Sequence, residues 1–270
     1  MKDLLVSIII PTYNSAKTIG ECLGSIRNQT IRNFEIIIVD RLSTDGTIEI
    51  AKEYGARIFI LDAERTEAKN FGASKSRGKY VLFIDSDMEL SERVLEECVA
   101  LAEENPRIGG IIIPERSVGD SLWSRIRNFE RNFYENTEIE SARFFRRNLL
   151  DKVAGFDEEV VFFEESTLPQ RIEKLRFTVK ARVKAEILHR EEEFSLSGWL
   201  KKKYYYGKTA RKYKQKYKDY GKKQISLPYR LGLYLKNKRF YSNPPLALGV
   251  LTLKFLEYFS AGLGYTINYD

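Results

Sequence analysis

The sequence predicts an α/β fold built on parallel strands, followed after residue 195 by a helical C-terminal appendage. Short, almost wholly apolar runs alternate with helical patterns in the first part of the chain, as buried parallel strands and their covering helices do. Polar side chains follow at once where three of these runs end. Beyond residue 195 the chain becomes basic and tyrosine-rich and then apolar.

The elements can be followed in order from the N-terminus. Residues 6–10 form the first apolar run, and residues 36–39 form the second, which ends at Asp40. Between them, residues 15–29 carry apolar side chains at helical spacing, and residues 47–54 open a second helix after a glycine turn. This alternation of strand and helix predicts an α/β sheet.

A third apolar run, residues 80–84, ends in Asp85-Ser86-Asp87. Residues two apart point the same way in extended chain, so both carboxylates can face one ligand. Mg²⁺ and Mn²⁺ take oxygen ligands and share them with phosphate, so this pair fits a metal held against a diphosphate. The alternative is an aspartate-rich turn at a strand end. Ligands of such sheets bind beyond the carboxyl ends of the strands, where the following residues fall: Thr12, Tyr13, Asp40, Asp85 and Asp87.

Two other nucleotide sites do not match the sequence. A dinucleotide-binding turn needs glycines directly after the first strand, but Pro-Thr-Tyr-Asn stands there. A P-loop needs four residues between its glycines, whereas five separate Gly72 from Gly78. We therefore expect phosphate charge to be neutralised by a metal on Asp85 and Asp87, with Arg65 assisting.

Six motifs in order give the chain a family resemblance over residues 4–195. It resembles a family 2 glycosyltransferase of the GT-A fold, which implies a mixed, mainly parallel sheet and a nucleotide-sugar donor. The motifs are Ser7-Ile8-Ile9-Ile10-Pro11-Thr12-Tyr13-Asn14, Val39-Asp40-Arg41-Leu42-Ser43-Thr44-Asp45-Gly46-Thr47, Arg65-Thr66-Glu67-Ala68-Lys69-Asn70-Phe71-Gly72, Asp85-Ser86-Asp87, Ala154-Gly155-Phe156-Asp157-Glu158 and Phe163-Glu164-Glu165.

The resemblance also implies roles for single residues. It places the donor's base, uracil by preference, near Pro11, Thr12, Tyr13 and Asp40. Arg65 would lie near the base or the phosphates, and the segment Asp85-Ser86-Asp87 would bind the diphosphate part of the donor. Mn²⁺ or Mg²⁺ would be held by Asp85 and Asp87, and His189, the single histidine of the chain, matches a position that completes the metal site in many GT-A enzymes.

The chain departs from the family's pattern at three positions. Arg41 stands where a second acid is common, which leaves the preferred base open. The acidic acceptor motif reads Glu164-Glu165 in place of Glu-Asp, and Thr167 replaces a further acid. By alignment Glu165 is the catalytic base, with Glu164 beside it, and a base favours a hydroxyl acceptor. The alternative is that both acids are the solvated start of a helix over residues 166–175.

The C-terminal part is predicted to associate with a membrane. Residues 199–239 hold 15 lysine and arginine residues against one acid, together with eight tyrosines, and residues 240–253 are uncharged. Basic, aromatic and then apolar sequence favours an anionic membrane over nucleic acid. Lys254 and Glu257 share a helical face, and together with glycines at 249, 262 and 264 this favours an interfacial helix or hairpin. Burial against protein is the alternative.

These observations together predict an inverting, metal-dependent glycosyltransferase that acts on a lipid-linked glycan at the cytoplasmic face of the membrane. A polyprenyl-phosphate glycosyltransferase, in which the lipid phosphate attacks, is an alternative that does not need Glu165. A nucleotide-binding scaffold without turnover is a second alternative. Residues 115–148 are rich in arginine and read equally as a cationic acceptor region or as a solvated helix.

Overall fold

The computed structural model describes residues 4–190 and 195–267, which form two compact units. Unit 1 comprises the chain up to residue 116 together with residues 141–158 and 164–189. Unit 2 comprises residues 117–140, 159–163 and the chain from residue 190. The boundary expected after residue 195 assigns 117–140 and 159–163 to the catalytic domain, whereas in the structure they group with the C-terminal helices.

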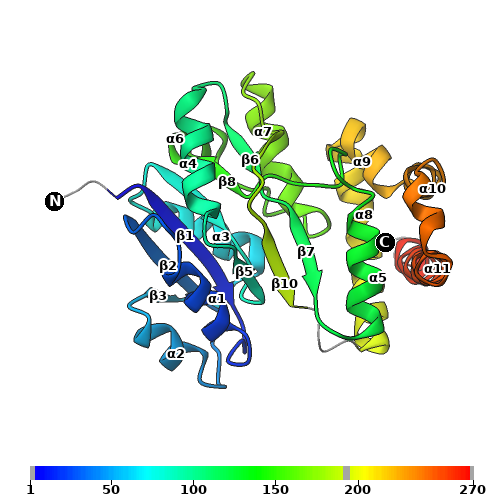
Figure 1. Cartoon of the computed structure of the whole chain (residues 1–270), viewed down its shortest axis with the longest axis horizontal. Coiled ribbons are helices and arrows are strands. Elements are labelled where there is room, and N and C mark those ends of the chain that lie inside the picture. The colour runs from blue at the N-terminus through cyan, green and yellow to red at the C-terminus, as the bar shows by residue number, and fades with distance from the viewer. Residues whose placement is uncertain (1–3, 191–194, 268–270) are drawn as a thin grey trace. The chain divides into compact units, whose positions relative to one another are not determined.

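Unit 1 is built on a mixed sheet whose larger part is parallel, as the resemblance implies (Figure 1). Within the described residues its strand order is β3-β2-β1-β4-β8-β6-β9. Strands β3, β2, β1 and β4 are parallel, β8 is antiparallel to both of its neighbours, and β9 is parallel to β6. The bounds are β1 Val6–Thr12, β2 Phe34–Asp40, β3 Arg57–Ile60, β4 Tyr80–Phe83, β6 Gly110–Ile112, β8 Phe144–Arg146 and β9 Ala181–Arg182.

A smaller sheet, in the order β5-β10-β7, brings distant segments to the end of β4. Its strands are β5 Met88–Leu90, β7 Glu115–Val118 and β10 Ile187–Arg190. Antiparallel pairing of β10 with β5 sets His189 opposite Met88. Strand β9 has only two residues and is an edge strand, with β6 as its one neighbour in the sheet as described.

Helices cover both faces of the larger sheet. Their bounds are α1 Ile19–Arg27, α2 Thr47–Glu53, α3 Arg65–Lys75, α4 Val94–Glu104, α6 Arg147–Val153 and α7 Thr167–Lys174. Alternate residues of β1 face opposite cores: Ile8 packs with residues of α1 and α4, and Ile9 packs with residues of α3, α6 and α7. Helix α1 begins at Ile19 rather than residue 15, and it is preceded by a turn in which the Ser15 carbonyl accepts the Thr18 amide.

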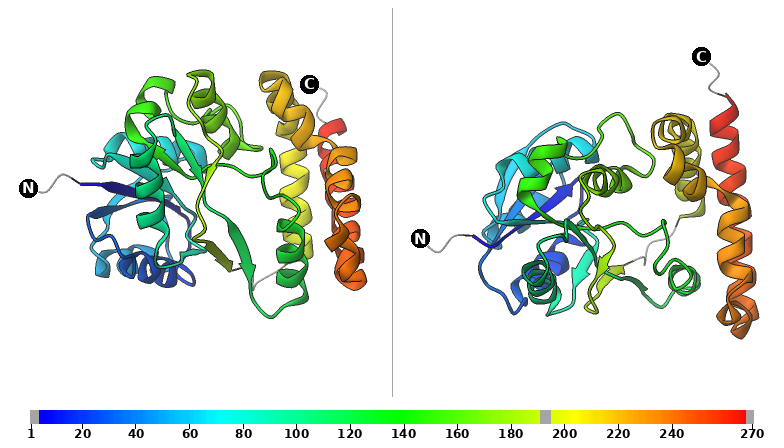
Figure 2. Two further views of the ribbon diagram at one scale, coloured as in Figure 1. Left: turned by 45° about the horizontal axis from the view of Figure 1, so that its top comes forward. Right: turned by 90° about the horizontal axis from the view of Figure 1, so that it is seen from above.

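Unit 2 is helical (Figure 2). It contains α5 Leu122–Arg131, α8 Leu196–Lys216, α9 Lys218–Ile225, α10 Leu227–Leu235, the short 3₁₀ helix η2 Lys238–Ser242 and α11 Pro244–Ile267. The C-terminal apolar segment is therefore one continuous helix and not a hairpin. It packs along α8 and also contacts α5.

Helix α5 lies inside the arginine-rich stretch of residues 115–148, for which the sequence allows either a cationic acceptor region or a solvated helix. It buries Ile126 and Glu130, and Ile126 shares a core with Phe133, Tyr234 and Val250. The helix is amphipathic, but its apolar face is covered by the C-terminal helices, so it is part of a packed helical unit.

Candidate active site

The carboxyl ends of β2, β1 and β4 lie side by side and carry the polar residues expected there. Thr12 pairs with Asp40 in the parallel register of β1 and β2. The amide of Ile84, just past β4, donates to the carbonyl of Ile9 on β1. The sheet therefore delivers Thr12, Asp40 and the Asp85-Ser86-Asp87 segment to one edge.

Asp40 is fully buried and its carboxylate is engaged within the chain. Its Oδ2 accepts hydrogen bonds from the hydroxyls of Thr12 and Ser43, each 2.6 Å long, and its Oδ1 accepts from the Ser43 amide at 2.8 Å. Asp40 thus holds the loop that follows β2. Its contact with a nucleotide base stays a prediction, and so does that of the buried Thr12.

Tyr13 and Arg41 flank that loop at the surface. The Tyr13 side chain is 62% exposed, and the Arg41 guanidinium lies 6.0 Å from the centre of its ring. Asp62 and Glu64 hold Arg41 at 3.2 and 3.0 Å. An exposed ring beside a guanidinium is a surface on which a planar base can stack.

Asp85 lies among cations. Its Oδ2 is 3.9 Å from Arg65 Nη1 and 3.8 Å from Arg143 Nη1. Burial alone would raise the pKa of Asp85, but the positive charges of Lys69, Arg65 and Arg143 outweigh burial and hold that pKa well below its usual range. Asp85 is therefore a carboxylate at every physiological pH.

Asp87 and His189 meet because β10 pairs with β5. His189 Nε2 lies 3.1 Å from Asp87 Oδ2, and its Nδ1 lies 3.9 Å from Glu115 Oε2. Ser86 turns the other way, and its hydroxyl donates to the Ser15 hydroxyl at 2.9 Å. Sequence proximity could not place His189 here, whereas the antiparallel register does.

The donor chemistry at this edge fits a divalent cation. A half-exposed carboxylate and an imidazole already lie in contact, and Mn²⁺ accepts both ligand types. Among the residues that the structure describes, no three His, Cys, Asp or Glu side chains converge as a ready metal site. The assignment of Asp85, Asp87 and His189 as ligands stays a prediction.

Glu164 and Glu165 form a carboxyl pair in the 3₁₀ turn η1 (Glu164–Ser166). The Glu164 side chain is 3% exposed, with Oε1 2.5 Å from Arg65 Nη2 and 3.7 Å from Lys69 Nζ. Burial would raise the pKa of Glu164, but Arg65 and Lys69 lower it overall. Glu164 therefore carries the negative charge of the pair.

Glu165 has the opposite titration behaviour. Burial, the charge of Glu164 and a hydrogen bond between the two carboxyl groups raise the pKa of Glu165 to about 7. The pair is thus not the fully solvated start of a helix, because Glu164 is buried. A carboxylate that binds a proton near neutral pH is suited to general-base catalysis.

Thr167, which replaces an expected acid, fixes the turn that carries this pair. Its hydroxyl donates to the Glu164 carbonyl at 2.7 Å and accepts the Asp157 amide at 3.0 Å. Asn70 clamps the preceding segment, since its side chain accepts the Phe156 amide at 2.8 Å and donates to the Phe156 carbonyl at 3.0 Å. The altered motif therefore keeps a defined geometry.

Sequence reasoning missed three charged residues of this region: Lys69, Arg143 and Glu115. Lys69 lies one helical turn after Arg65 on α3, a spacing that puts both on one face. Arg143 just precedes β8, and its carbonyl accepts the Phe83 amide, which brings it next to the end of β4. Arg143 binds Glu115 at 2.5 Å. An arginine at the edge of the apolar run 144–145 is the signal that could have pointed to it.

The comparisons with known proteins agree with this arrangement. The family model for glycosyl transferase family 2 matches residues 7–158. The chain belongs to glycosyl transferase family 2. Among its curated relatives, it is 36% identical over 107 residues to the glycosyltransferase GlyG of Streptococcus pneumoniae, covering 37% of this chain and 36% of GlyG. It is 35% identical over 109 residues to the poly(ribitol-phosphate) beta-N-acetylglucosaminyltransferase TarS of Staphylococcus aureus, covering 37% of this chain and 19% of TarS.

Solved glycosyltransferase structures share the fold over almost the whole chain. S. aureus TarS 1–349 in complex with UDP-GlcNAc superposes with a TM-score of 0.61 at 22% identity, covering 96% of this chain and 83% of that one. The mannosyltransferase PcManGT of Pyrobaculum calidifontis, in complex with GDP-Man and Mn²⁺, has a TM-score of 0.65 at 18% identity, covering 98% and 88%. These likenesses establish the GT-A fold. The matched part of this chain spans little more than a third of GlyG and less of TarS.

Proposed function

We propose that this family 2 glycosyltransferase is an inverting, metal-dependent enzyme that moves a sugar from a nucleotide-sugar to a hydroxyl of a lipid-linked glycan at the cytoplasmic face of the membrane. The observation that carries the proposal is the carboxyl pair Glu164-Glu165. One member is charged and held by Arg65 and Lys69, and the other has its pKa raised to about 7. Such a pair supplies one base poised to take a proton.

In the proposed reaction Glu165 accepts the proton of the acceptor hydroxyl as its oxygen attacks the anomeric carbon. The bond from that carbon to the diphosphate breaks on the opposite face, so configuration inverts. Asp85, Asp87 and His189 would hold Mn²⁺ or Mg²⁺, and a metal bound there supplies positive charge to the leaving diphosphate. Arg65 and Arg143 lie within 4 Å of Asp85 and fix its orientation.

The donor is proposed to be a UDP-sugar. TarS, which shares the fold, has been solved in complex with UDP-GlcNAc, and this supports uridine. PcManGT has been solved in complex with GDP-Man, so guanosine is the second candidate. Tyr13 offers an exposed ring for either base, with Pro11 and Ser86 completing the donor site proposed here.

The acceptor decides between the main proposal and its alternative. An ionised lipid phosphate can attack without a base, whereas a sugar hydroxyl gains from one. The raised pKa of Glu165 supports a hydroxyl acceptor, because a carboxylate with a pKa of about 7 is basic enough to take a hydroxyl proton as the bond forms.

The test is Glu165→Gln, assayed for transfer to lipid-linked sugar and to polyprenyl phosphate. We expect transfer to the hydroxyl acceptor to fall roughly 10²–10⁴-fold, the range that general bases supply. Glu67→Gln removes the same charge from an exposed position on α3 and should leave the rate unchanged. A near-normal rate for Glu165→Gln would favour the phosphate acceptor, and donor binding without any turnover in the unsubstituted protein would favour a scaffold.

A further inference from the structure

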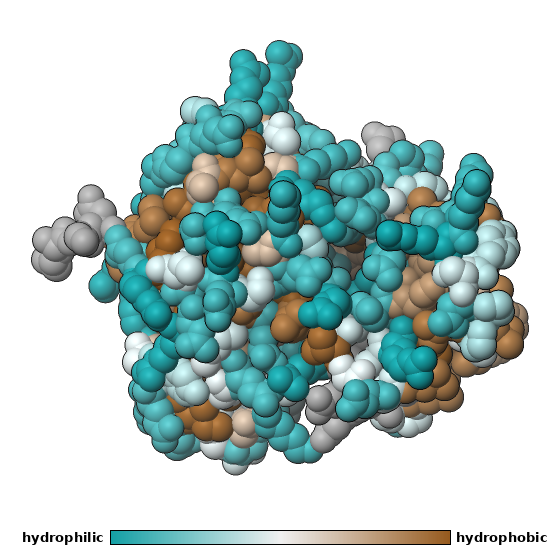
Figure 3. All heavy atoms as spheres, viewed as in Figure 1, coloured by the Kyte–Doolittle hydropathy of each residue, from teal (hydrophilic) through white to brown (hydrophobic). Residues whose placement is uncertain are grey.

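The last helix, α11, presents large apolar side chains to solvent. The exposed fractions are 66% for Leu248, 69% for Phe255, 59% for Phe259, 43% for Leu263 and 63% for Ile267. Steps of seven, four, four and four residues keep these side chains on one face of a helix. Figure 3 shows apolar residues gathered over the α10–α11 region. We call these five side chains the apolar stripe.

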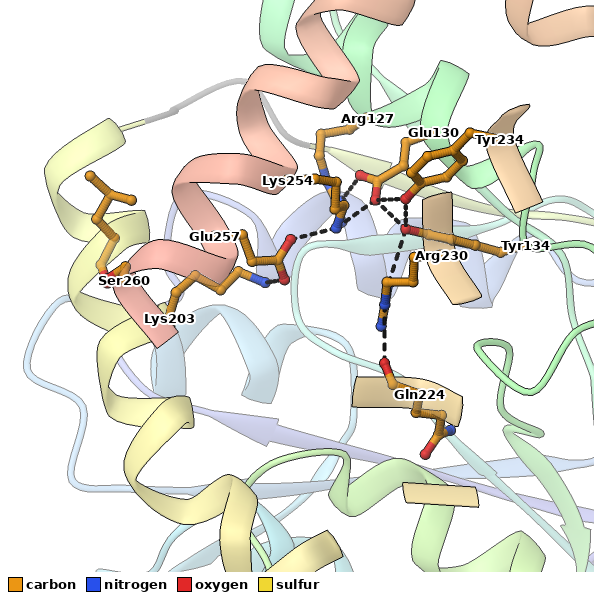
Figure 4. A network of polar contacts seen from close by, with 11 residues as sticks. Arg127, Glu130, Tyr134, Lys203, Gln224, Arg230, Tyr234, Lys254, Glu257 and Ser260 are labelled. Atoms are coloured by element: carbon orange, nitrogen blue, oxygen red, sulfur yellow. Dashed lines mark hydrogen bonds and ion pairs between the residues drawn. The ribbon is translucent and has the colours of Figure 1, made fainter. Parts of the chain in front are cut away.

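The opposite face of α11 carries its charges, and they are buried. The Lys254 side chain is 4% exposed, and its Nζ lies 2.7 Å from Glu130 Oε1 on α5. Lys254 also pairs with Glu257 on α11 itself, and Glu257 pairs with Lys203 Nζ on α8 at 2.6 Å. Figure 4 shows this chain of alternating charges running from α5 through α11 to α8.

Further polar contacts extend the network around Glu130. Tyr234 on α10 donates to Glu130 Oε1 at 3.1 Å, and Arg230 donates to the Tyr134 hydroxyl at 3.0 Å and to the Gln224 carbonyl at 3.0 Å. The Ser260 hydroxyl donates to the Leu200 carbonyl at 2.7 Å, one turn beyond Glu257. The contacts of Lys254 with α5, and of Glu257 and Ser260 with α8, therefore fix the rotation of α11 about its own axis.

This network discriminates between two ways in which α11 can meet a membrane. By length and composition the helix could cross a bilayer. Lys254 and Glu257, however, lie near its middle. A lone crossing would pull both charges away from Glu130 and Lys203 and carry them into hydrocarbon, where ionised side chains are strongly disfavoured. A helix lying flat keeps every one of these pairs.

The segment before α11 supplies charge complementary to an anionic surface. Lys236, Lys238 and Arg239 are exposed, and they stand among the exposed side chains of Leu235 and Tyr241. Basic residues attract anionic headgroups, and tyrosine favours the boundary between headgroup and acyl chain.

We propose that α11 lies in the plane of an anionic bilayer surface, with the apolar stripe in the outer acyl region and Lys236, Lys238 and Arg239 against lipid phosphates. The inference deepens the membrane location proposed above and does not require turnover. The occupant of the stripe is thus lipid, and not a second copy of the chain.

Vesicle flotation of the full chain tests the surface. We expect binding to vesicles of phosphatidylcholine with phosphatidylglycerol, and roughly tenfold or greater loss of binding in Phe255→Ser/Phe259→Ser, since two aromatic side chains can then no longer enter the acyl region. Ile60→Ser changes a 50% exposed apolar residue of unit 1 and should bind normally. Replacing Lys236, Lys238 and Arg239 with Gln should reduce binding to the level seen on phosphatidylcholine alone.

Labelling with a membrane-impermeant maleimide tests the orientation. Ser242→Cys places a thiol at an exposed position before α11, Asp270→Cys places one in the sequence beyond α11, and the native Cys22 and Cys98 are buried. On sealed vesicles both new thiols should react from outside. Protection of Asp270→Cys alone would show a spanning helix and overturn the proposal. Unchanged vesicle binding in the Phe255→Ser/Phe259→Ser variant would also overturn the proposal. The same holds for self-association that occurs without vesicles and is abolished by these two substitutions. Calorimetric donor binding, measured on the same variants, reports separately on the transferase site.

Discussion

At the scale of single residues, the pKa of Glu165 links structure to rate. A general base works only when deprotonated, and burial beside the charged Glu164 raises the pKa of Glu165 to about 7. We predict that kcat/KM rises about tenfold per pH unit below pH 7 and levels off above it. A rate that is flat between pH 5 and pH 8 would contradict the assignment of Glu165 as the base.

The same shift predicts a stability change with a definite sign. A carboxyl whose pKa is raised by folding binds its proton more tightly in the folded chain, so the folded state loses stability as pH rises from the ordinary value through about 7. Glu165→Gln removes this loss. We therefore expect the free energy of unfolding in urea, taken as variant minus unsubstituted protein, to be higher at pH 8.5 than at pH 5. The rate of sugar transfer by the same variant should fall.

A second residue, Arg143, is predicted to be structurally essential. Its side chain is 14% exposed and faces both Glu115 and Asp85. Arg143→Leu leaves two carboxylates without this partner, and we expect a loss of about 3 kcal/mol in the free energy of unfolding. Arg93→Leu breaks an exposed pair with Glu96 and should cost less than about 1 kcal/mol. Equal losses in the two variants would contradict the role given to Arg143.

Residue types at strand ends could be predicted from the sequence, but their partners could not. Asp85 and Asp87 follow an apolar run, and that pattern is local. The contact of Asp87 with His189 depends on the pairing of two short strands about a hundred residues apart. The burial of Asp40 depends on hydrogen bonds from Thr12 and Ser43, and nothing in its neighbouring sequence distinguishes a buried aspartate from one that contacts a ligand.

At the scale of elements, two glycines set the contact between α8 and α11. A Cβ atom at Gly207 would overlap the Ala261 carbonyl, and one at Gly264 would overlap the Tyr204 carbonyl. Gly207→Ala or Gly264→Ala should cost at least about 1–3 kcal/mol, because backbone cannot yield as a side chain can. Gly262→Ala meets no atom within 4 Å and should be neutral or stabilising by up to about 1 kcal/mol. Thermal unfolding of the three variants separates these outcomes, and a neutral Gly207→Ala would contradict the close packing.

Continuous apolar runs explain why β1, β2 and β4 could be predicted, since strands buried on both faces have no polar positions. From the sequence alone, the glycines of the C-terminal segment are compatible with either a helix or a hairpin. In the structure Gly249 and Gly264 serve helix crossings, against Ile126 and Tyr204 respectively. Only the three-dimensional packing distinguishes a glycine at a crossing from one at a break.

At the scale of the whole molecule, the interrupted path of the chain makes the C-terminal helices inseparable from residues 117–140. Ile126 and Phe133 share their core with Tyr234, Phe240 and Val250. A fragment of residues 1–195 would expose these side chains, so we predict that it aggregates or loses the fold of its 117–140 segment. A monomeric fragment with the stability of the full chain would contradict this. The change in composition near residue 196 predicts a domain boundary there. The packing of residues 117–140 against the C-terminal helices could not be predicted in this way, because contacts between distant segments do not alter local composition.

The central claim is that a metal-dependent nucleotide-sugar site lies at the carboxyl edge of the sheet. Calorimetric titration with UDP-, GDP- and dTDP-sugars, with and without Mn²⁺, tests it most directly. We predict that one nucleotide, uridine first, binds only with Mn²⁺ and that Asp87→Ala abolishes binding, whereas Asp151→Ala, at a side chain 69% exposed on α6, does not. Nucleotide-sugar binding that is unchanged by Mn²⁺ and by Asp87→Ala would contradict the account, and so would the failure of every nucleotide to bind.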